Sequence, residues 1–245
     1  MVLQVTGLSK AYGGVRAVRD VSFSVAPREL VAIIGPNGAG KTTCFNLLNG
    51  QLAPDSGEIR LGNAHLAGLP PHRIARLGVG RTFQVAATFG SMSVRANVQT
   101  ALLSHRQCNF SLWRQARKLF VAEADALLER VGMREQAERP CAVLAYGDLK
   151  RVELAIAIAH RPRVLLMDEP TAGMAPEERG SLMSLAQGLA RDDGIAVLFT
   201  EHDMSVVFGF ASRIIVMHLG AVIAQGTPEA VRADPRVREV YLGDA

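Results

Sequence analysis

Cysteine is scarce in this chain of 245 residues, and its three copies stand far apart. Cys44, Cys108 and Cys141 are odd in number and lack the paired spacing of zinc ligands, which argues against a disulfide framework and against a zinc site. Five of the six histidines also lack metal-ligand spacing. We therefore expect free thiols and no zinc centre.

Aromatic residues make up only 5% of the chain, and Trp113 is its single tryptophan. The basic residues Arg114, Arg117 and Lys118 lie beside it, but no series of aromatic side chains accompanies them for stacking on bases. The net charge of +4 is small, and the basic residues are dispersed. Contact with nucleotide or anionic lipid is compatible with this charge, whereas nucleic-acid binding is not expected.

Long hydrophobic runs are absent as well. Hydrophobic residues make up 49% of the chain, yet no apolar stretch approaches the length of about 18 residues that indicates a membrane-spanning helix. Met1 to Lys10 lack the charged and apolar regions of a secretory signal, so the sequence predicts a cytoplasmic protein. The length suits one large α/β domain, with or without an inserted lobe.

What the chain does contain is a glycine-rich loop. Gly35 to Thr42 match the phosphate-binding pattern G-x-x-x-x-G-K-[ST] at every fixed position. The apolar run Leu30 to Ile34 in front of it predicts a buried parallel strand, and Thr42 to Asn49 can continue as a helix. Glycines let successive backbone N–H groups turn inward around a phosphate at the helix N-terminus. The sequence therefore predicts a nucleoside triphosphate site.

Two side chains of this loop carry its chemistry. Lys41 supplies a positive charge to the β- and γ-phosphates, and the Thr42 hydroxyl is placed to bind Mg²⁺. The nucleotide-binding residues predicted for this segment are Gly35, Pro36, Asn37, Gly38, Ala39, Gly40, Lys41, Thr42 and Thr43.

A second apolar run, Val164 to Met167, predicts another buried strand, and two carboxylates follow it. Ligands of open α/β sheets bind at the carboxyl ends of the strands, where Asp168 and Glu169 are expected. We expect Asp168 to hold Mg²⁺ through water and Glu169 to polarise the attacking water as general base. His202 follows a further predicted strand, residues 196–200, and faces the same edge.

The rest of the chain is expected to form an antiparallel sheet and a helical lobe. Tyr12 lies in a predicted loop, where stacking on a nucleotide base and a half-buried surface position are equally compatible with the sequence. We expect the helical lobe to span about residues 85–160, between core segments 1–84 and 161–245. The expected strands are 2–5, 21–25, 58–61, 79–84, 213–217 and 221–225; the expected helices are 72–77, 148–159 and 176–191, with helical spacing also over 93–131.

These motifs resemble those of the ATP-binding subunits of ABC transporters, and the resemblance covers essentially the whole chain. It implies an α/β P-loop NTPase with a parallel sheet core, an antiparallel β subdomain and an inserted helical subdomain. The matching motifs are Tyr12 where adenine stacks, Gly35 to Thr42 as the first Walker motif, Gln84 as the Q-loop glutamine, Leu144 to Asp148 at the signature motif, Val164 to Glu169 as the second Walker motif, and His202 as the switch histidine.

The resemblance also implies a role for each residue. ATP and Mg²⁺ would be the cofactors, with Glu169, His202 and Gln84 catalytic and with Thr42, Gln84 and Asp168 at the metal. The signature residues would contact the ATP that a partner subunit holds, and these are Ala145, Tyr146 and Gly147.

Within that family, the chain looks like the ATPases of branched-chain amino acid importers. Arg81 to Gln84, the Leu-Ala-Tyr-Gly form of the signature, Glu201 to Met204 and Tyr241 to Gly243 carry this likeness. It implies a homologous ATPase partner in a homo- or heterodimer, two transmembrane permease subunits and, indirectly, an extracytoplasmic binding protein. It places the chain at the cytoplasmic face of the inner membrane, with no nucleic acid bound.

Other functions on the same phosphate-binding loop can be compared with the importer ATPase through motifs of this sequence. Importers of urea, amides or aromatic acids and the lipopolysaccharide exporter ATPase share the architecture, so this chain does not encode the transported ligand. A soluble ABC ATPase of DNA repair or translation usually has two cassettes, a coiled coil or zinc modules. A small-molecule kinase would leave Leu144 to Asp148 and His202 without a role. Departures from the family pattern are Ala145 for serine, Tyr146 for glycine, Asp148 for glutamine and Ala175 for aspartate.

Overall fold

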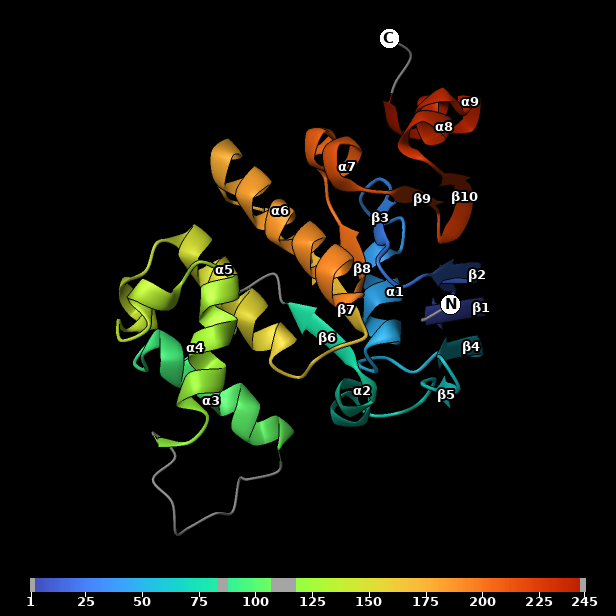
Figure 1. Cartoon of the computed structure of the whole chain (residues 1–245). Helices are drawn as coiled ribbons and strands as arrows, with labels where there is room; N and C mark the ends of the chain where they lie inside the picture. The colour runs from blue at the N-terminus through green and yellow to red at the C-terminus, as the bar shows by residue number, and fades with distance from the viewer. Residues whose placement is uncertain (1–2, 83–87, 107–117, 243–245) are drawn as a thin grey trace.

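The computed structural model describes residues 3–82, 88–106 and 118–242. Its centre is a six-stranded sheet in the order β10-β9-β3-β8-β7-β6 (Figure 1). Five strands pair in parallel, and only β10 runs antiparallel to its neighbour β9. The strands are β3 (Leu30–Ile34), β6 (Val79–Thr82), β7 (Val164–Asp168), β8 (Ala196–Thr200), β9 (Arg213–His218) and β10 (Ala221–Gly226).

The parallel strands are buried on both faces, which explains why they read as continuous apolar runs rather than alternating ones. Leu30, Ala32 and Ile34 belong to one hydrophobic cluster, whereas the intervening Val31 and Ile33 belong to a second cluster on the opposite face. Because packing covers both faces, only the strand ends remain for binding and chemistry.

A second sheet is antiparallel, with strands in the order β2-β1-β4-β5. These are β1 (Leu3–Tyr12), β2 (Val15–Val25), β4 (Ser56–Leu61) and β5 (Ala64–His65). The expectation of short strands 2–5 and 21–25 around a long loop is wrong, because β1 and β2 continue to a tight turn at Gly13 and Gly14. Irregular pairing between Val5 and Ala11 interrupts the alternation of apolar and polar residues, and this conceals the long strands from a pattern search.

Helices pack on both sides of the parallel sheet. The α-helices are α1 (Lys41–Leu48), α2 (Pro71–Leu77), α3 (Val94–His105), α4 (Val121–Arg130), α5 (Tyr146–Ile158), α6 (Pro176–Asp193), α7 (Met204–Phe210), α8 (Pro228–Ala233) and α9 (Pro235–Val237). Short 3₁₀ turns occupy Arg134–Gln136 and Cys141–Val143, and a π turn occupies Arg238–Leu242.

Helices α3, α4 and α5 form a group beside the sheet, in the region where the sequence predicts a helical lobe (Figure 1). Helix α5 begins two residues before the expected Asp148, and the Ser93 side chain caps α3 by accepting from the Ala96 N–H. The predicted lobe boundary at residue 85 lies outside the described residues. In the described part of the chain, no helix combines the length and the apolarity needed to cross a membrane.

Candidate functional site

The glycine-rich loop joins β3 to α1, as its sequence predicts. Glycine is required at positions 35 and 40 because neighbouring backbone leaves no room for a side chain. A Cβ atom on Gly35 would lie 2.1 Å from the Met217 carbonyl oxygen, and one on Gly40 would lie 2.3 Å from the Ala17 carbonyl oxygen. Gly40 also has φ of 99°, in the left-handed region that favours glycine. The loop is therefore held between β9 and β2, and α1 starts at Lys41 with its N-terminus at the loop.

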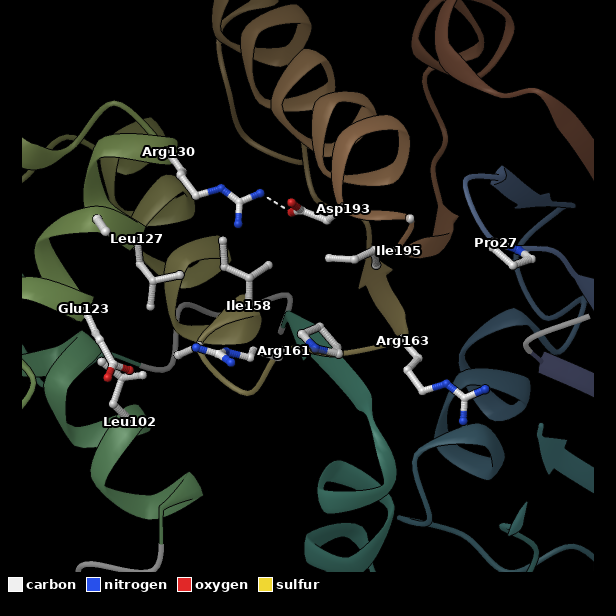
Figure 2. Close-up of a pocket in the computed structure, with 14 residues that line it drawn as sticks. Pro27, Leu102, Glu123, Leu127, Arg130, Ile158, Arg161, Arg163, Asp193 and Ile195 are labelled. Atoms are coloured by element: carbon white, nitrogen blue, oxygen red, sulfur yellow. Dashed lines mark hydrogen bonds and ion pairs between the residues drawn. The ribbon is translucent and has the colours of Figure 1, made fainter. Parts of the chain in front are cut away.

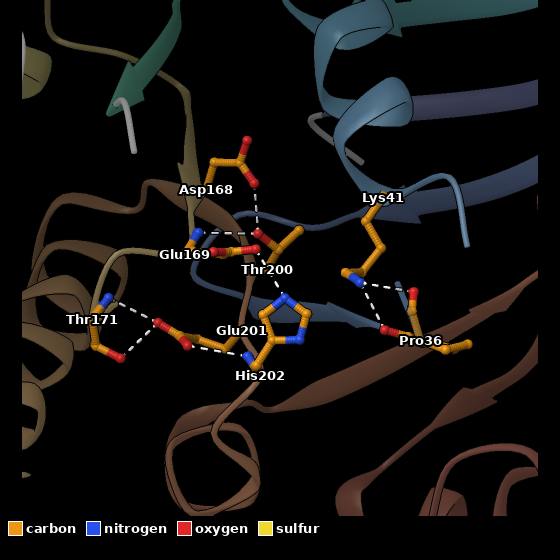
Figure 3. Close-up of polar contacts among 9 residues, drawn as sticks. Pro36, Lys41, Asp168, Glu169, Thr171, Thr200, Glu201 and His202 are labelled. Carbon is orange, nitrogen blue, oxygen red and sulfur yellow. Dashed lines mark hydrogen bonds and ion pairs between the residues drawn. The ribbon is translucent and has the colours of Figure 1, made fainter. Parts of the chain in front are cut away.

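Lys41 is buried, with 7% of its surface exposed. Its ammonium group donates to the Gly35 carbonyl oxygen at 2.7 Å and to the Pro36 carbonyl oxygen at 3.2 Å (Figure 3). Burial lowers the pKa of Lys41, while the carboxylates of Glu169 and Asp168 oppose that change. The lysine and the two acids therefore share one electrostatic environment, although they are more than 120 positions apart in the chain.

Asp168 ends β7, and both of its carboxylate oxygens accept hydrogen bonds. Oδ1 accepts from the Thr200 hydroxyl at 2.7 Å, and Oδ2 accepts from the Arg81 guanidinium at 3.2 Å. The same guanidinium donates to the side-chain oxygens of Asn46 and Gln51, at 2.9 and 3.0 Å. Arg81 thus connects the acid to α1 and the segment after it, a role that its position in a short strand did not reveal.

Glu169 lies one residue beyond β7, with its backbone in the left-handed region at φ 47°. Its N–H donates to the Thr200 hydroxyl at 3.0 Å and to the Thr200 carbonyl oxygen at 3.2 Å, which fixes the strained residue beside β8. Its Oε1 lies 2.9 Å from Nε2 of His202, as Figure 3 shows. The structure therefore brings the predicted base and the predicted switch histidine into direct contact.

Glu201 is a functional candidate that the sequence reasoning missed. It is 3% exposed, and one carboxylate oxygen accepts from both the N–H and the hydroxyl of Thr171, at 2.8 and 2.7 Å. The other oxygen accepts from the His202 N–H at 3.2 Å. The sequence did contain a signal for it, because Glu201 directly follows the apolar strand Ala196–Thr200. A carboxylate buried at the end of such a strand needs hydrogen-bond partners and so indicates a built site.

Other predicted site residues lie apart from this cluster. Tyr12 ends β1 and is 46% exposed, with the Lys10 ammonium 5.9 Å from its ring centre. Ala145, Tyr146 and Gly147 lie at the start of α5, in the group of helices beside the sheet. Gln84 lies outside the described residues.

The start of α5 has a tightly packed neighbour of its own. A Cβ atom on Gly147 would lie 2.8 Å from a carboxylate oxygen of Glu178. Glu178 accepts from the Ala175 N–H at 3.2 Å and so closes the first turn of α6. The predicted signature segment therefore packs against the first turn of α6.

Residues 18–172 match the protein family described as ABC transporter, and residues 221–245 match the family described as branched-chain amino acid ATP-binding cassette transporter. The chain belongs to the ABC transporter family. The resemblance that the motifs carry is thus confirmed, and with it the α/β P-loop fold and the assignment as an ATPase.

Relatives of this ABC protein match along its whole length. The high-affinity branched-chain amino acid transport ATP-binding protein LivG of Escherichia coli (strain K12) is 42% identical over 253 residues, covering 100% of this chain and 98% of LivG. The corresponding protein BraF of Pseudomonas aeruginosa is 41% identical, with coverage of 100% and 98%. The lipopolysaccharide export system ATP-binding protein LptB of Acidithiobacillus ferridurans is 37% identical, with coverage of 99% and 97%.

Solved structures agree with the fold. The ADP conformation of MJ1267, an ATP-binding cassette of an ABC transporter, has a TM-score of 0.87 and 29% identity, and the match covers 99% of each chain. The dimeric structure of MJ0796, a bacterial ABC transporter cassette, has a TM-score of 0.77 and 25% identity, covering 92% of this chain and 98% of that one.

Proposed function

We propose that this ABC protein hydrolyses Mg²⁺-ATP to power the import of branched-chain amino acids. The observation that carries the proposal is the convergence of Lys41, Asp168, Glu169 and His202 at the carboxyl edge of the parallel sheet. The full-length similarity to LivG and BraF supports the substrate class.

Each group of the cluster has a task that its surroundings favour. The Lys41 ammonium, already next to the phosphate loop, would exchange its two carbonyl partners for phosphate oxygens. Glu169 would take the proton of the attacking water. His202, in contact with the Glu169 carboxylate, would orient that base and sense whether the γ-phosphate is present.

Mg²⁺ is the cofactor that the donor set fits. Asp168 and the exposed Thr42 offer a carboxylate and a hydroxyl oxygen, the hard ligands that Mg²⁺ prefers. Among the described residues no group of three His, Cys, Asp or Glu side chains forms a metal cage. At nucleotide sites Mg²⁺ is usually held by one or two protein oxygens together with phosphate oxygens and water. When bound, the metal would neutralise charge on the β- and γ-phosphates.

The proposed assembly places a second ATPase subunit against this one. Ala145, Tyr146 and Gly147 start α5, which contacts α3, α4, α6 and β6, whereas α1 contacts β2 and β7. A signature segment outside its own nucleotide cluster suits contact with a partner's ATP, and MJ0796 is a dimer. Two transmembrane permease subunits and an external binding protein complete the proposed importer, with this chain on the cytoplasmic membrane face.

Uptake of radiolabelled leucine tests this function. Cells that lack their own branched-chain amino acid importer ATPase would receive this chain together with permease and binding-protein genes from the same genome. We expect leucine uptake with the native chain, none with Lys41→Ala, and native uptake with the control Lys118→Ala, whose side chain is exposed. Purified protein would be tested for Mg²⁺-ATP binding and phosphate release. ATP hydrolysis without leucine uptake would contradict the substrate class, and absence of ATP binding would contradict the whole proposal.

A further inference from the structure

A cavity of about 680 Å³ lies at the opposite edge of the sheet from the nucleotide cluster (Figure 2). Pro27, Arg163 and Ile195 line it just before strands β3, β7 and β8 begin. Leu102 of α3 and Leu127 of α4 line it from the helical group. The volume lies within the range of about 300 to 1,000 Å³ typical of small-molecule sites.

The walls of the cavity are largely aliphatic. Leu102, Ile158 and Ile195 are 3%, 3% and 6% exposed, and the partly buried Leu127 joins them. Figure 2 shows Leu127, Ile158 and Ile195 following one another across the cavity from α4 to β8. An extended aliphatic chain bound along this row would be removed from contact with water over most of its length.

The charged groups around these walls do not balance. Arg130 is paired with Asp193 across the cavity, and Glu123 is paired with Arg106 at 3.1 Å. By contrast, the exposed side chains of Arg161 and Arg163, which also line the cavity, make no hydrogen bond or ion pair with the residues that the structure describes. Figure 2 shows the Arg161 side chain below Ile158.

Arg161 also occupies a backbone position that suits another residue better. Arg161 lies three residues beyond the end of α5, with φ of 48°, and its N–H donates to the Ile158 carbonyl oxygen at 2.9 Å. This left-handed conformation after a helix is one that glycine usually supplies. An arginine there is strained, and residues in strained backbone conformations cluster at active sites and ligand sites.

We propose that this cavity binds a medium-chain aliphatic carboxylate, such as a fatty-acid anion. Arg161 holds the carboxylate through its guanidinium, which matches two carboxylate oxygens in one plane. The aliphatic row from Leu127 to Ile195 takes the hydrocarbon chain. Because the bound molecule touches both the helical group and the sheet, it links the two parts on the side away from ATP.

Titration calorimetry with the native full-length chain tests the proposal with hexanoate, octanoate and decanoate below their micelle concentrations. We expect binding to tighten about tenfold for each two added methylenes, as burial of a hydrocarbon chain predicts. 1-Decanol has the same chain without the carboxylate, and we expect it to bind at least about tenfold more weakly than decanoate. Leucine tests the other small aliphatic carboxylate, and we expect it to bind more weakly than decanoate.

The decisive variant is Arg161→Gly, which removes the guanidinium and suits the left-handed backbone. We expect decanoate to bind at least about tenfold more weakly to it, with ATP affinity and thermal unfolding temperature not lowered. Arg28→Gly is the matched control, since Arg28 is an exposed arginine with φ of 66° that does not line the cavity. Equal decanoate binding by Arg161→Gly and the native chain would overturn the proposal. So would tighter binding of leucine or equal binding of 1-decanol, or no decanoate binding at millimolar concentration while ATP still binds.

Discussion

The Glu201 carboxylate accepts two hydrogen bonds from Thr171, one from its N–H at 2.8 Å and one from its hydroxyl at 2.7 Å. Thr171 follows Glu169 by two residues, and Glu201 directly precedes His202. The buried carboxylate therefore connects the segment that carries the proposed general base to the segment that carries the proposed switch histidine. The same two segments also meet directly, where Nε2 of His202 lies 2.9 Å from Oε1 of Glu169.

Loss of the Glu201 carboxylate should impair turnover more than nucleotide binding. In Glu201→Ala two buried donors of Thr171 lose their acceptor, which costs about 1 to 3 kcal/mol of stability for each group left unsatisfied. We expect kcat to fall by about ten- to a hundredfold with a nearly unchanged KM for ATP, because a misplaced base loses catalytic geometry. Steady-state ATPase assays and thermal unfolding would measure both effects.

Two further variants separate positioning from simple loss of fold. Glu201→Gln keeps one carbonyl acceptor for Thr171 and should recover part of the lost kcat. In Thr171→Val the hydroxyl is gone. Adding Glu201→Gln to this variant should therefore lower kcat by a smaller factor than Glu201→Gln does in the native chain. Additive effects of the two substitutions on kcat would show that the pair does not act together.

Glu169→Gln should keep ATP binding and lose turnover. The amide cannot accept the proton of the attacking water, so we expect a fall in ATPase rate by a factor on the order of a hundred or more. Glu177→Gln is the matched control, because this glutamate is exposed in the first turn of α6. An unchanged rate in Glu169→Gln, with Mg²⁺-ATP bound normally, would remove Glu169 from the role of general base.

Several parts of this site were predictable from sequence, and others were not. Lys41, Asp168, Glu169 and His202 follow strands or a glycine loop, and parallel strands bring their carboxyl ends to one edge. Arg81 donates to Asp168, 87 positions away, and such a pairing depends on strand order rather than on any local pattern. The long β1–β2 hairpin was missed for a local reason, since its bulges interrupt the period of two on which strand prediction rests.

The segment after the predicted Q-loop should contact a permease. Thr88 is partly buried, and the adjacent Phe89 is 58% exposed, an unusual position for a large apolar side chain unless another surface covers it. A cysteine at Thr88 should crosslink to a permease subunit in assembled membranes, whereas one at the exposed Glu229 of α8 should not. Mass spectrometry would identify the partner, and labels found only on soluble proteins would contradict the transporter assembly.

Cys44 should resist alkylation in the folded protein. The sequence suggests that an adduct beside the phosphate loop disturbs nucleotide binding, but Cys44 is fully buried, and burial raises the pKa of its thiol to about 12. Only the thiolate reacts, so at pH 8 the reactive fraction is far below one per cent. Peptide mapping after maleimide treatment should find Cys44 unmodified until denaturant is added. Rapid modification of Cys44 in native buffer would contradict the observed packing.

The altered signature should act on the partner's nucleotide rather than on this chain's own. Ala145 lacks the hydroxyl that serine would donate to a phosphate, an interaction worth about 1.5 to 3 kcal/mol where it forms, so the backbone near Gly147 has to supply the contact. We expect Gly147→Asp to abolish turnover of the partner-bound ATP while the Lys41 site still binds nucleotide nearly normally. Separate photolabelling of each subunit in the assembled complex would measure this.

The structure adds a complication to that substitution and also the means to resolve it. An aspartate at 147 would place a second carboxylate against Glu178, whose oxygen is 2.8 Å from the added Cβ atom and whose side chain closes the first turn of α6. Like charges repel at this distance, so part of the effect could come from a displaced α6 rather than from the partner's phosphate.

Glu178→Gln removes the second charge and retains an acceptor for the Ala175 N–H. If the signature works across the interface, Gly147→Asp should abolish partner turnover in the Glu178→Gln background as well. Recovery of turnover in the double variant, or loss of labelling on this chain with the partner intact, would mean that the arrangement between subunits is wrong.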